Sequence, residues 1–394
     1  MKKIKVMTVL GTRPEIIRLS RVMARLDALT DHRIVHTGQN RDHELNGIFF
    51  DELGLRPPDH HLGADTSSLG AALGSILTGT ERVLLAERPD AFLVLGDTNS
   101  ALSAIIARRL RVPVYHMEAG NRSFDANVPE ETNRKIVDHV ADYNLVYTEH
   151  ARRHLLSEGI HHRRIFLTGS PMREVLDHCR AGIAASGILG RLGLTGRRYF
   201  AVSLHREENV DDPARLGAIT AILNDLASAY AMPVIVSLHP RTRDRLEKIP
   251  GIAFGGRVRA MKPLGFHDYI RLQSEAFCVI SDSGTVAEEA AILGFPAITP
   301  RDAIERPEAL DTGNLVTTGI DRDGIFGAIA ALAGAPEGGG GARPGCAAAR
   351  IPGEYDVPDT SRRVAKLILG TARLTHRRDG IRRPAWAGAA DVAA

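Results

Sequence analysis

Short apolar runs rich in valine, isoleucine and leucine alternate along this chain with longer stretches of helical composition. The runs are Ile4–Leu10, Ile34–Thr37, Ala91–Leu95, Val112–His116, Tyr143–Tyr147, Tyr199–Leu204, Val234–Leu238, Phe277–Ser281 and Asn314–Val316. Two of the helix-like stretches are Ser100–Leu110 and Glu131–Val140. Strands that alternate with helices form parallel sheets that are covered by helices on both faces. The pattern therefore predicts an α/β protein.

The runs fall into two groups, separated near Gly169-Ser170-Pro171. The length of 394 residues also suits two domains. We predict two doubly wound, Rossmann-like domains, residues 1–170 and 171–372, that face a central cleft, followed by a tail at 373–394. The glycine-rich segment 336–350 is predicted to be a surface insertion. Ligands bind beyond the carboxyl ends of the strands in open parallel sheets, so the residues directly after each run are the candidates for function.

Composition and charge exclude several classes of protein. Fifty basic against 47 acidic residues give a net charge of +3, which provides no bulk attraction for nucleic acid or for an anionic membrane. We find no apolar run near the roughly 20 residues that span a bilayer. The three cysteines are far apart and outside any CxxC pair, which argues against a disulfide framework or a structural zinc site. We expect a cytoplasmic protein with no nucleic-acid or membrane partner.

The first run is followed by residues 11–18, GTRPEIIR, which do not match the GxGxxG dinucleotide fingerprint. Thr12 and Glu15 have the spacing of a helix capping box. Arg13 and Arg18 would then lie near a helix N-terminus, where an anion is favoured. A well-capped helix with solvated arginines explains the same residues, so an anion site is one of two interpretations.

Three acidic residues of the first group lie after strands or open a helix. Asp97 follows the third run, Glu118 follows the fourth, and Glu130 begins the next helix-like stretch. A helix cap would explain Asp97, and an i,i+4 salt bridge with Arg134 would explain Glu130. Three carboxylates at the strand ends of one domain nevertheless suit acid/base chemistry, because proximity and burial raise the pKa of a carboxyl group.

The first strand of the second group is followed by His205 and Arg206. A single histidine after a strand is more often structural than catalytic, but an arginine neighbour at a predicted cleft favours a functional role. Later, Arg306-Pro307-Glu308 is a turn by composition or a second anion contact.

The strongest local signal is Asp282–Glu289, DSGTVAEE, which follows Phe277–Ser281. A glycine and two hydroxyl groups at the start of a helix form a backbone cradle for phosphate. Glu289, one turn into the helix, would accept hydrogen bonds from a ribose diol. An ordinary capped helix explains this segment equally well when it is taken alone.

Taken together, these segments resemble the non-hydrolysing UDP-N-acetylglucosamine 2-epimerases. The resemblance is carried in order by Gly11–Glu15 (GTRPE), Gly96-Asp97-Thr98 (GDT), Met117–Arg122 (MEAGNR), Pro129–Arg134 (PEETNR), His205–Asn209 (HREEN), Asp282–Glu289 (DSGTVAEE) and Arg306–Glu308 (RPE). It spans nearly all of residues 4–320. It implies the two-domain glycosyltransferase-B fold, in agreement with the pattern of runs.

The resemblance implies inversion at C2 of a UDP-sugar, without cofactor or metal, that interconverts UDP-GlcNAc and UDP-ManNAc. UDP is first eliminated to give a 2-acetamidoglucal and then adds back, while a proton is delivered to the opposite face of C2. Two faces require at least two proton-handling groups. By motif match these are Asp97, Glu118 and Glu130, and His205 assists the departing diphosphate.

The resemblance also implies a set of substrate-binding residues and a homodimer. Arg13 and Arg18 would hold UDP oxygens, the helix that begins near Ser283 would bind the diphosphate, and Glu289 would bind the ribose. The complete set that we predict for the UDP-sugar is Arg13, Arg18, Arg206, Ser283, Gly284, Thr285, Glu289 and Arg306. A cleft that closes would keep water from the reactive glycal.

The sequence departs from the common family pattern at several positions. Arg18 stands where a lysine is usual, Thr285 replaces a second glycine, and Glu207 replaces the second arginine of an HRRE pattern. The version MEAGNRSFD at residues 117–125 resembles a branch that acts on UDP-6-deoxy-N-acetyltalosamine or UDP-2,3-diacetamido-glucuronic acid. Such a modified substrate, a hydrolysing epimerase, a UDP-sugar glycosyltransferase and a non-catalytic nucleotide-sugar sensor are the alternatives.

Overall fold

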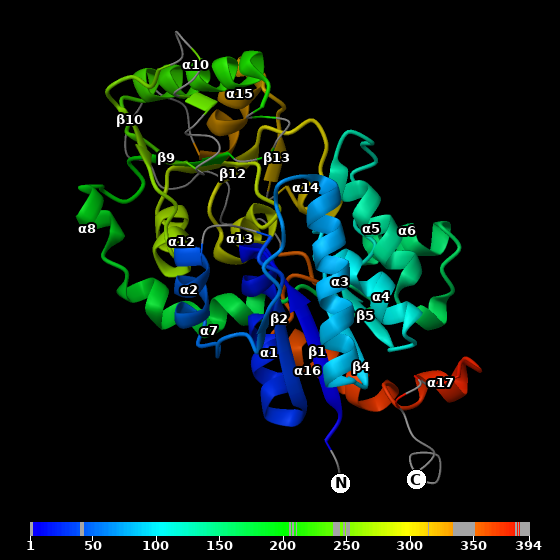
Figure 1. The fold of residues 1–394 in the computed structure, drawn as a ribbon. Helices are drawn as coiled ribbons and strands as arrows, with labels where there is room; N and C mark the ends of the chain where they lie inside the picture. Colours follow the sequence, from blue (N-terminus) through cyan, green and yellow to red (C-terminus); the bar gives the residue numbers. More distant parts are fainter. Residues whose placement is uncertain are drawn as a thin grey trace. The chain divides into compact units, whose positions relative to one another are not determined.

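The computed structural model describes residues 3–39, 43–204, 206, 209, 211–238, 245–246, 249, 253–313, 315–333, 351–382, 384 and 386. The chain forms two compact units (Figure 1). Unit 1 consists of Met1–Asp177 together with Asp356–Ala394, and unit 2 consists of His178–Tyr355. The predicted insertion at 336–350 lies outside the described residues, and so do residues 383, 385 and 387–394 of the predicted tail.

Unit 1 is built around a seven-stranded parallel sheet with the order β3-β2-β1-β4-β5-β6-β7. Its strands are β1 (Lys5–Leu10), β2 (Asp31–His36), β3 (His60–His61), β4 (Ala91–Leu95), β5 (Val114–Met117), β6 (Tyr143–Val146) and β7 (Ile165–Leu167). Its helices are α1 (Arg13–Leu29), α2 (His43–Glu52), α3 (Leu69–Glu87), α4 (Ala104–Arg109), α5 (Pro129–Val140), α6 (Glu149–Ser157), α16 (Thr360–Thr371) and α17 (Thr375–Arg378). Helix α7 (Met172–Ala185) runs from unit 1 into unit 2.

Unit 2 contains a six-stranded parallel sheet with the order β10-β9-β8-β11-β12-β13. Its strands are β8 (Phe200–Leu204), β9 (Val234–Leu238), β10 (Val258–Met261), β11 (Cys278–Ser281), β12 (Ala297–Thr299) and β13 (Leu315–Thr317). Its other helices are α8 (Ile188–Leu192), α10 (Pro213–Ala229), α12 (Phe266–Ser274), α13 (Val286–Leu293), α14 (Pro307–Asp311) and α15 (Arg322–Ala333).

Helices cover both faces of each sheet, and the central strands β4, β8 and β11 are largely apolar on both sides. In unit 2, Phe200 and Val202 pack in one cluster with residues of α10 and α15. The alternate residues Tyr199 and Ala201 pack in another cluster with residues of α8, α12 and α13. Side chains alternate across a strand, so a run that is buried on both faces is largely apolar. These observations confirm the predicted fold class of two doubly wound α/β units.

Both sheets have a strand order that reverses next to their first strand. The reversal lies between β1 and β4 in unit 1 and between β8 and β11 in unit 2. Loops at the carboxyl ends of such a pair of strands diverge, which leaves room for a ligand. The GTRPE and GDT motifs follow β1 and β4, and the HREEN and DSGT motifs follow β8 and β11. The strongest motifs therefore flank the two switch points.

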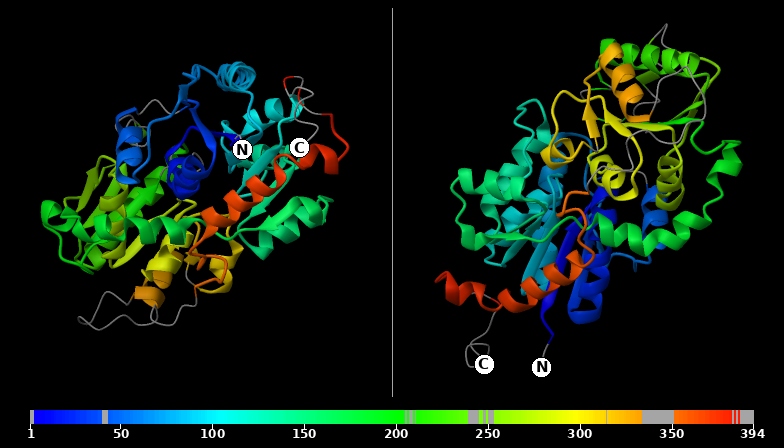
Figure 2. Two further views of the ribbon diagram at one scale, coloured as in Figure 1. Left: turned by 90° about the horizontal axis from the view of Figure 1, so that it is seen from below. Right: turned by 180° about the vertical axis from the view of Figure 1, so that it is seen from behind.

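The limits of the units differ from the predicted domains of 1–170 and 171–372. The first change of unit falls after Asp177, and the chain returns to unit 1 at Asp356. The reason is that α16 packs against α1 (Figure 2). Backbone and side chain of Ser361 both donate to the carboxylate of Glu174, at 2.8 and 2.5 Å, which fastens the start of α16 to unit 1. Residues 373–394, predicted to be a tail, also belong to unit 1.

Helix α3 is the one helix among the described residues that is long and apolar enough to cross a membrane, judged by length and composition alone. Only 28% of its apolar window is buried. The prediction that no stretch reaches this length missed α3 because glycine, serine and threonine interrupt its apolar residues. Core helices of globular proteins pass the same test, so a single such helix does not by itself indicate a membrane-spanning segment.

Candidate functional site

Asp97 and Glu118 leave adjacent strands at the same edge of the unit 1 sheet. In the register of β4 and β5, Leu95 is paired with Met117. Glu118 follows Met117 directly, and Asp97 follows Leu95 after one glycine. The structure therefore brings together two of the three carboxylates that the sequence predicts for acid/base chemistry.

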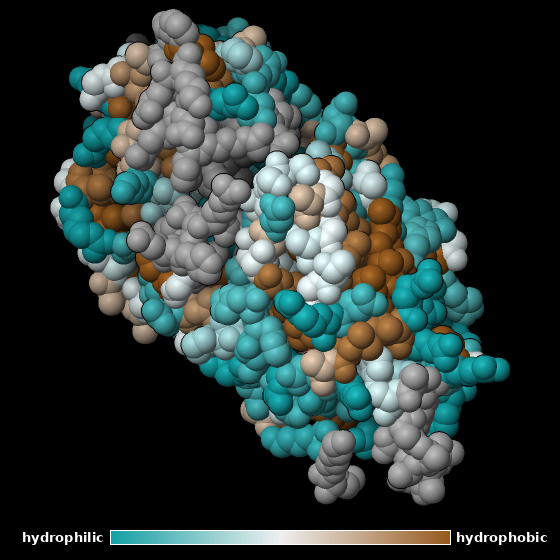
Figure 3. Space-filling view, in the orientation of Figure 1, coloured by the Kyte–Doolittle hydropathy of each residue, from teal (hydrophilic) through white to brown (hydrophobic). Residues whose placement is uncertain are grey.

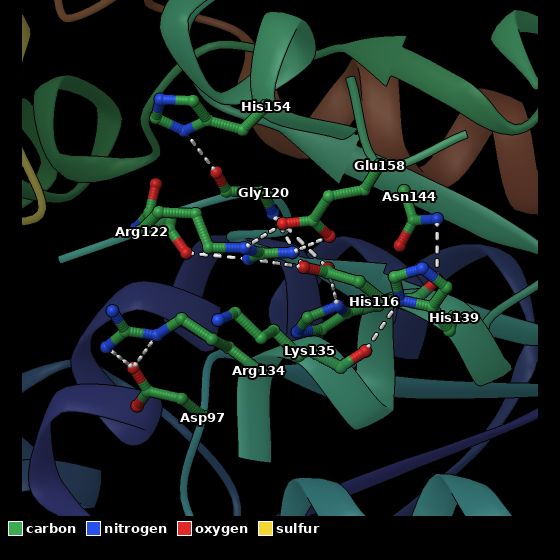
Figure 4. A network of polar contacts seen from close by, with 12 residues as sticks. Asp97, His116, Gly120, Arg122, Arg134, Lys135, His139, Asn144, His154 and Glu158 are labelled. Atoms are coloured by element: carbon green, nitrogen blue, oxygen red, sulfur yellow. Dashed lines mark hydrogen bonds and ion pairs between the residues drawn. The ribbon is translucent and has the colours of Figure 1, made fainter. Parts of the chain in front are cut away.

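Helix α5 holds the loop that carries Asp97. Both Nε and Nη2 of Arg134 donate to Oδ2 of Asp97, at 3.2 and 2.5 Å. Figure 4 shows the Arg134 side chain reaching Asp97. In addition, Nδ2 of Asn133 donates to the carbonyl oxygen of Asp97 at 2.9 Å. Sequence reasoning missed both contacts, because it treated Arg134 only as a local partner of Glu130.

Glu118 sits in the left-handed region of backbone conformation, with φ of +62°. That conformation is unfavourable for a residue with a side chain and has to be held by its surroundings. Its Oε2 forms an ion pair with Nη1 of Arg18 from α1, and its Oε1 accepts from Nδ2 of Asn121 at 3.3 Å. The side chains of Arg18 and Glu118 are 3% and 14% exposed. Arg18, predicted to hold UDP oxygens, thus contacts one of the predicted proton carriers.

Glu130 is the second residue of α5 and is half-buried. Its neighbour Glu131 accepts from the backbone N–H and the hydroxyl of Ser123, at 3.1 and 3.0 Å, and from Arg134 at 3.0 Å. Burial raises the pKa of Glu131, but these contacts and Lys135 bring it below its ordinary value. Glu131 is therefore an ionised structural anchor that fixes the loop before α5, and Glu130 is the candidate for proton transfer.

Glu15 joins the loops on the two sides of the unit 1 switch point. Its Oε2 accepts from the backbone N–H groups of Gly11 and Thr12, at 2.9 and 2.8 Å, and its Oε1 accepts from the Thr98 hydroxyl at 2.9 Å. Burial raises the pKa of Glu15 to about 7, although these hydrogen bonds lower it. Glu15, predicted to be part of a helix capping box, thus also contacts Thr98, the residue after Asp97.

Gly11 is required by close packing at the same place. A Cβ atom on Gly11 would lie 2.1 Å from Oγ1 of Thr37 and 2.4 Å from Oγ of Ser100. Arg13 begins α1 two residues later and is half-buried. The conformation of the GTRPE segment is therefore fixed by contacts of Gly11 and Glu15, which leave Arg13 at the helix N-terminus as predicted.

In unit 2, Asp282 ties the two loops at the switch point together. It is fully buried, and its Oδ2 accepts from the backbone N–H of Arg206 at 3.0 Å and from Nδ2 of Asn209 at 3.1 Å. Nη2 of Arg206 lies 3.9 Å from Oε1 of Glu305. His205, predicted to assist the departing diphosphate, lies outside the described residues.

The residues before α13 leave open space beside a guanidinium group. Among the described residues, a Cβ atom on Gly284 would meet only Nη2 of Arg206 within 4 Å, at 3.8 Å. The hydroxyl groups of Ser283 and Thr285 lie 3.1 Å apart, and Thr285 is the N-cap residue of α13. Backbone N–H groups at a helix N-terminus next to an arginine favour an anion such as a phosphate.

Two other predicted contacts of the UDP-sugar are buried. Glu289 is 3% exposed, and burial, together with the charge of Glu289, raises the pKa of Tyr269 well above its ordinary value. Arg306 is also 3% exposed, and its Nη2 lies 3.7 Å from Oε2 of Glu288. Arg306 therefore has a carboxylate neighbour inside unit 2. Among the described residues, no group of three or more histidine, cysteine or acidic side chains is arranged to hold a metal ion.

Comparison with known proteins gives a consistent result. The family model described as UDP-N-acetylglucosamine 2-epimerase matches residues 24–369. The solved UDP-N-acetylglucosamine 2-epimerase of Rickettsia bellii is 40% identical, with 95% of this chain and 98% of that chain covered and a TM-score of 0.86. The Methanocaldococcus jannaschii UDP-GlcNAc 2-epimerase, solved in complex with UDP-GlcNAc and UDP, is 33% identical, with 93% and 99% covered and a TM-score of 0.83. The UDP-2,3-diacetamido-2,3-dideoxy-D-glucuronate 2-epimerase of Pseudomonas aeruginosa is 37% identical over 327 residues, which are 82% of this chain and 90% of that protein.

Proposed function

Because the chain belongs to the UDP-N-acetylglucosamine 2-epimerase family, we propose that it interconverts UDP-GlcNAc and UDP-ManNAc without hydrolysing them. The observation that carries this proposal is the placement of Asp97 and Glu118 on adjacent strand ends, each contacted by a buried arginine. Inversion at C2 needs two proton-handling groups, and adjacent strand ends provide two carboxylates in fixed positions.

The reaction begins with removal of the C2 proton by a carboxylate of unit 1, while the bond between C1 and the diphosphate oxygen breaks and UDP departs. UDP then adds back to C1 of the glycal, and a second carboxylate delivers a proton to the opposite face of C2. Asp97, Glu118 and Glu130 are the candidates for these two roles. Arg18 and Arg134 orient two of them, and no external oxidant or reductant is consumed.

The loop before α13 is proposed to bind the diphosphate. Ser283, Gly284 and Thr285 would provide backbone and hydroxyl donors at the helix N-terminus, and Arg206 lies beside Gly284. Arg13 at the start of α1, Glu289 and Arg306 complete the proposed set of contacts to UDP, with His205 assisting the leaving group. No cofactor is required by this mechanism.

Proton NMR with UDP-GlcNAc in deuterium oxide, without added metal or nucleotide cofactor, tests the proposal. We expect the H2 signal to disappear while UDP-ManNAc forms with deuterium at C2. Release of UDP and free sugar would replace the proposal with a hydrolysing epimerase. A protein that leaves UDP-GlcNAc unchanged would overturn UDP-GlcNAc as substrate.

A second candidate substrate is UDP-2,3-diacetamido-2,3-dideoxy-D-glucuronate. The relative named for that sugar is 37% identical, which is as high as the 36% of a relative named for UDP-GlcNAc. The segment 117–125 also resembles that branch. The same NMR experiment with the diacetamido sugar distinguishes the two, because the preferred substrate is the one with the higher kcat/KM.

We further propose a cytoplasmic homodimer in which α3 contributes to the contact between subunits. Leu69 and Leu85 of α3 are 68% and 47% exposed. Figure 3 shows apolar surface on and beside this helix. The two described cysteines, Cys179 and Cys278, are buried and form no disulfide with each other, as expected in a reducing compartment. Light scattering of the purified protein should give twice the chain mass, and Leu69→Glu with Leu85→Glu should give a monomer. A monomeric wild-type protein would contradict the proposed dimer.

A further inference from the structure

A buried polar network lies next to the strand ends that carry Asp97 and Glu118, and the proposed mechanism does not use it. His116 and Asp138 are fully buried, and Arg122 is 1% exposed. Figure 4 shows His116, Arg122 and their partners beside the Arg134–Asp97 contact. Burial of charged groups is costly unless each is paired, so the pairing of this network defines what it can do.

His116 faces oxygen atoms with both of its ring nitrogens. It lies in β5, paired in register with Val94 of β4. Its Nε2 is 2.8 Å from the carbonyl oxygen of Gly96, and its Nδ1 is 2.9 Å from Oδ1 of Asp138. A carbonyl oxygen only accepts hydrogen bonds, so Nε2 carries a proton.

Asp138 is surrounded by donors. Each of its carboxylate oxygens is 3.2 Å from the backbone nitrogen of Gly120, and Oδ2 accepts from Nη1 of Arg122 at 2.8 Å. Burial raises the pKa of Asp138, but the hydrogen bonds and charges of His116 and Arg122 lower it below its ordinary value. Because Arg122 and the backbone N–H of Gly120 donate to its oxygens, Asp138 is held as a carboxylate and cannot donate, so Nδ1 of His116 carries a proton as well.

The charges of the network then balance. Arg122 donates from Nε and Nη2 to the two oxygens of Glu158, at 2.7 and 2.6 Å. His116 and Arg122 provide two positive charges, and Asp138 and Glu158 provide two negative charges. A neutral set of fully hydrogen-bonded ions is the form in which buried charges are tolerated.

The two donors of His116 end at the two loops that carry proton carriers. One contact ends on Gly96, the residue before Asp97, and the other passes through Asp138 to Gly120, two residues after Glu118. We propose that His116 is a positioning residue whose two N–H groups, through Gly96 and Asp138, fix the carboxylates of Asp97 and Glu118 relative to each other.

The turn that carries Glu118 depends on such support. Glu118 and Gly120 both have positive φ, +62° and +80°. A Cβ atom on Gly120 would lie 2.4 Å from the carbonyl oxygen of Ala151, so the turn is pressed against α6. The hydrogen bonds of Gly120 to Asp138 hold the backbone N–H of this turn inside the protein. A shift of this turn would move the Glu118 side chain.

Two substitutions separate the two contacts of His116. His116→Gln places its amide near Nε2 and keeps the donor to Gly96, whereas His116→Asn places its amide near Nδ1 and keeps the donor to Asp138. We expect each to lower kcat about 10- to 100-fold, since small misplacements of reacting groups have effects of this size. KM and the affinity for UDP should change less than twofold. His139→Gln is the control, because His139 is exposed and contacts the carbonyl oxygen of Lys135.

The protonation of the ring is a second readout that does not require a variant to be active. Protein labelled with ¹⁵N-histidine should show two ring N–H signals for His116, assigned by their loss in His116→Gln or, if that variant does not fold, by the change in Asp138→Asn. Asp138→Asn should remove the Nδ1–H signal and keep the Nε2–H signal, because an asparagine amide can donate to Nδ1. A wild-type His116 with a single ring N–H would overturn the inference.

The activity test rests on the proposed function, and the two fail differently. A wild-type enzyme that inverts neither UDP-GlcNAc nor the diacetamido sugar would overturn the proposed function. An active wild-type enzyme whose two folded His116 variants keep kcat within threefold would overturn the positioning role alone. Thermal unfolding of each variant shows whether it is folded, and the ring N–H signals of the wild-type protein decide the question if neither is.

Discussion

Two nitrogen atoms of Arg134 donate to a single oxygen of Asp97, Oδ2, at 3.2 and 2.5 Å. The Arg134 side chain is 3% exposed and that of Asp97 is 28% exposed. The buried arginine therefore holds the more exposed carboxylate of Asp97 in place. This contact lies at the carboxyl ends of the unit 1 strands, where the sequence motifs of this unit also lie. Because Arg134 also contacts Glu131, the loop before α5 and the loop after β4 share one buried cation.

Replacement of Arg134 tests whether this contact orients Asp97. Arg134→Lys keeps the charge but places one nitrogen instead of two on Oδ2 of Asp97. We expect kcat to fall at least about 10-fold in steady-state assays. Lys135→Gln is the matched control, because Lys135 is half exposed and contacts Glu131 at 3.4 Å. Its kcat should stay within twofold of wild type. Full activity of Arg134→Lys would show that orientation of Asp97 does not limit the reaction.

Glu118→Gln should abolish C2 inversion and leave UDP binding nearly intact. The substitution removes a proton carrier and not a phosphate contact, so we expect kcat to fall by about 10³-fold or more. Isothermal titration with UDP gives the affinity, and NMR in deuterium oxide gives the exchange at C2. Glu149→Gln on the surface of α6 is the control. An active Glu118→Gln enzyme would remove Glu118 from the mechanism.

Gly284→Ala should reduce the affinity for UDP without destabilising the protein. In the described part of the chain, a Cβ atom at this position meets only Nη2 of Arg206, at the ordinary contact distance of 3.8 Å, so we expect the unliganded protein to accommodate it. It would occupy the space proposed for the diphosphate, and we expect the Kd for UDP to rise about 10-fold or more. Ser283→Ala should weaken UDP binding as well, because it removes a hydroxyl donor.

Gly190→Ala is the control for Gly284→Ala, because a Cβ at Gly190 would meet no described residue beyond its own helix backbone and chain neighbours within 4 Å. Unfolding temperature and UDP affinity are measured for both. Unchanged UDP affinity in Gly284→Ala and Ser283→Ala together would contradict a phosphate cradle before α13.

Glu15 should make the stability of the protein depend on pH. Burial raises its pKa from 4.5 to about 7. A raised folded-state pKa means that the stabilisation by protonated Glu15 is fully present below pH 4.5 and is lost as the pH rises through about 7. Between pH 5 and pH 8 this loss amounts to about 2–3 kcal/mol in the free energy of unfolding.

Glu15→Gln removes this titration. Relative to wild type, the free energy of unfolding of the variant should improve by about 2–3 kcal/mol from pH 5 to pH 8 in urea titrations. Glu81→Gln on the exposed side of α3 should show the wild-type dependence on pH. An equal pH dependence of Glu15→Gln and wild type would show that Glu15 has no raised pKa.

The nine strands predicted from apolar runs all overlap observed strands, because a parallel strand buried on both faces has a continuous apolar sequence. In β4, for example, all five residues are buried. Four observed strands were missed, and they are very short or lie at a sheet edge: β7 and β12 are apolar but have only three residues each. Strand β3 has two residues, and β10 carries exposed Arg259 and Ala260 at the edge of its sheet.

The positions of the predicted site residues followed from the motifs, but their partners did not. Arg18 and Glu118 are 100 residues apart, and Arg134 and Asp97 are 37 apart. Local spacing suggests only helical neighbours such as Glu130 and Arg134, whereas these contacts depend on the order of strands in the sheet. Burial of Arg306 next to Glu288 likewise depends on the packing of α13 against α14.

The return of the chain to unit 1 after Tyr355 has a consequence for how the protein is made. Helix α16 packs on α1, yet it is synthesised more than 330 residues after it. On the ribosome, the unit that begins first therefore has to wait, with the α1 surface uncovered, until the whole of unit 2 has emerged. Unit 2 is continuous in sequence and is free to complete its own core earlier.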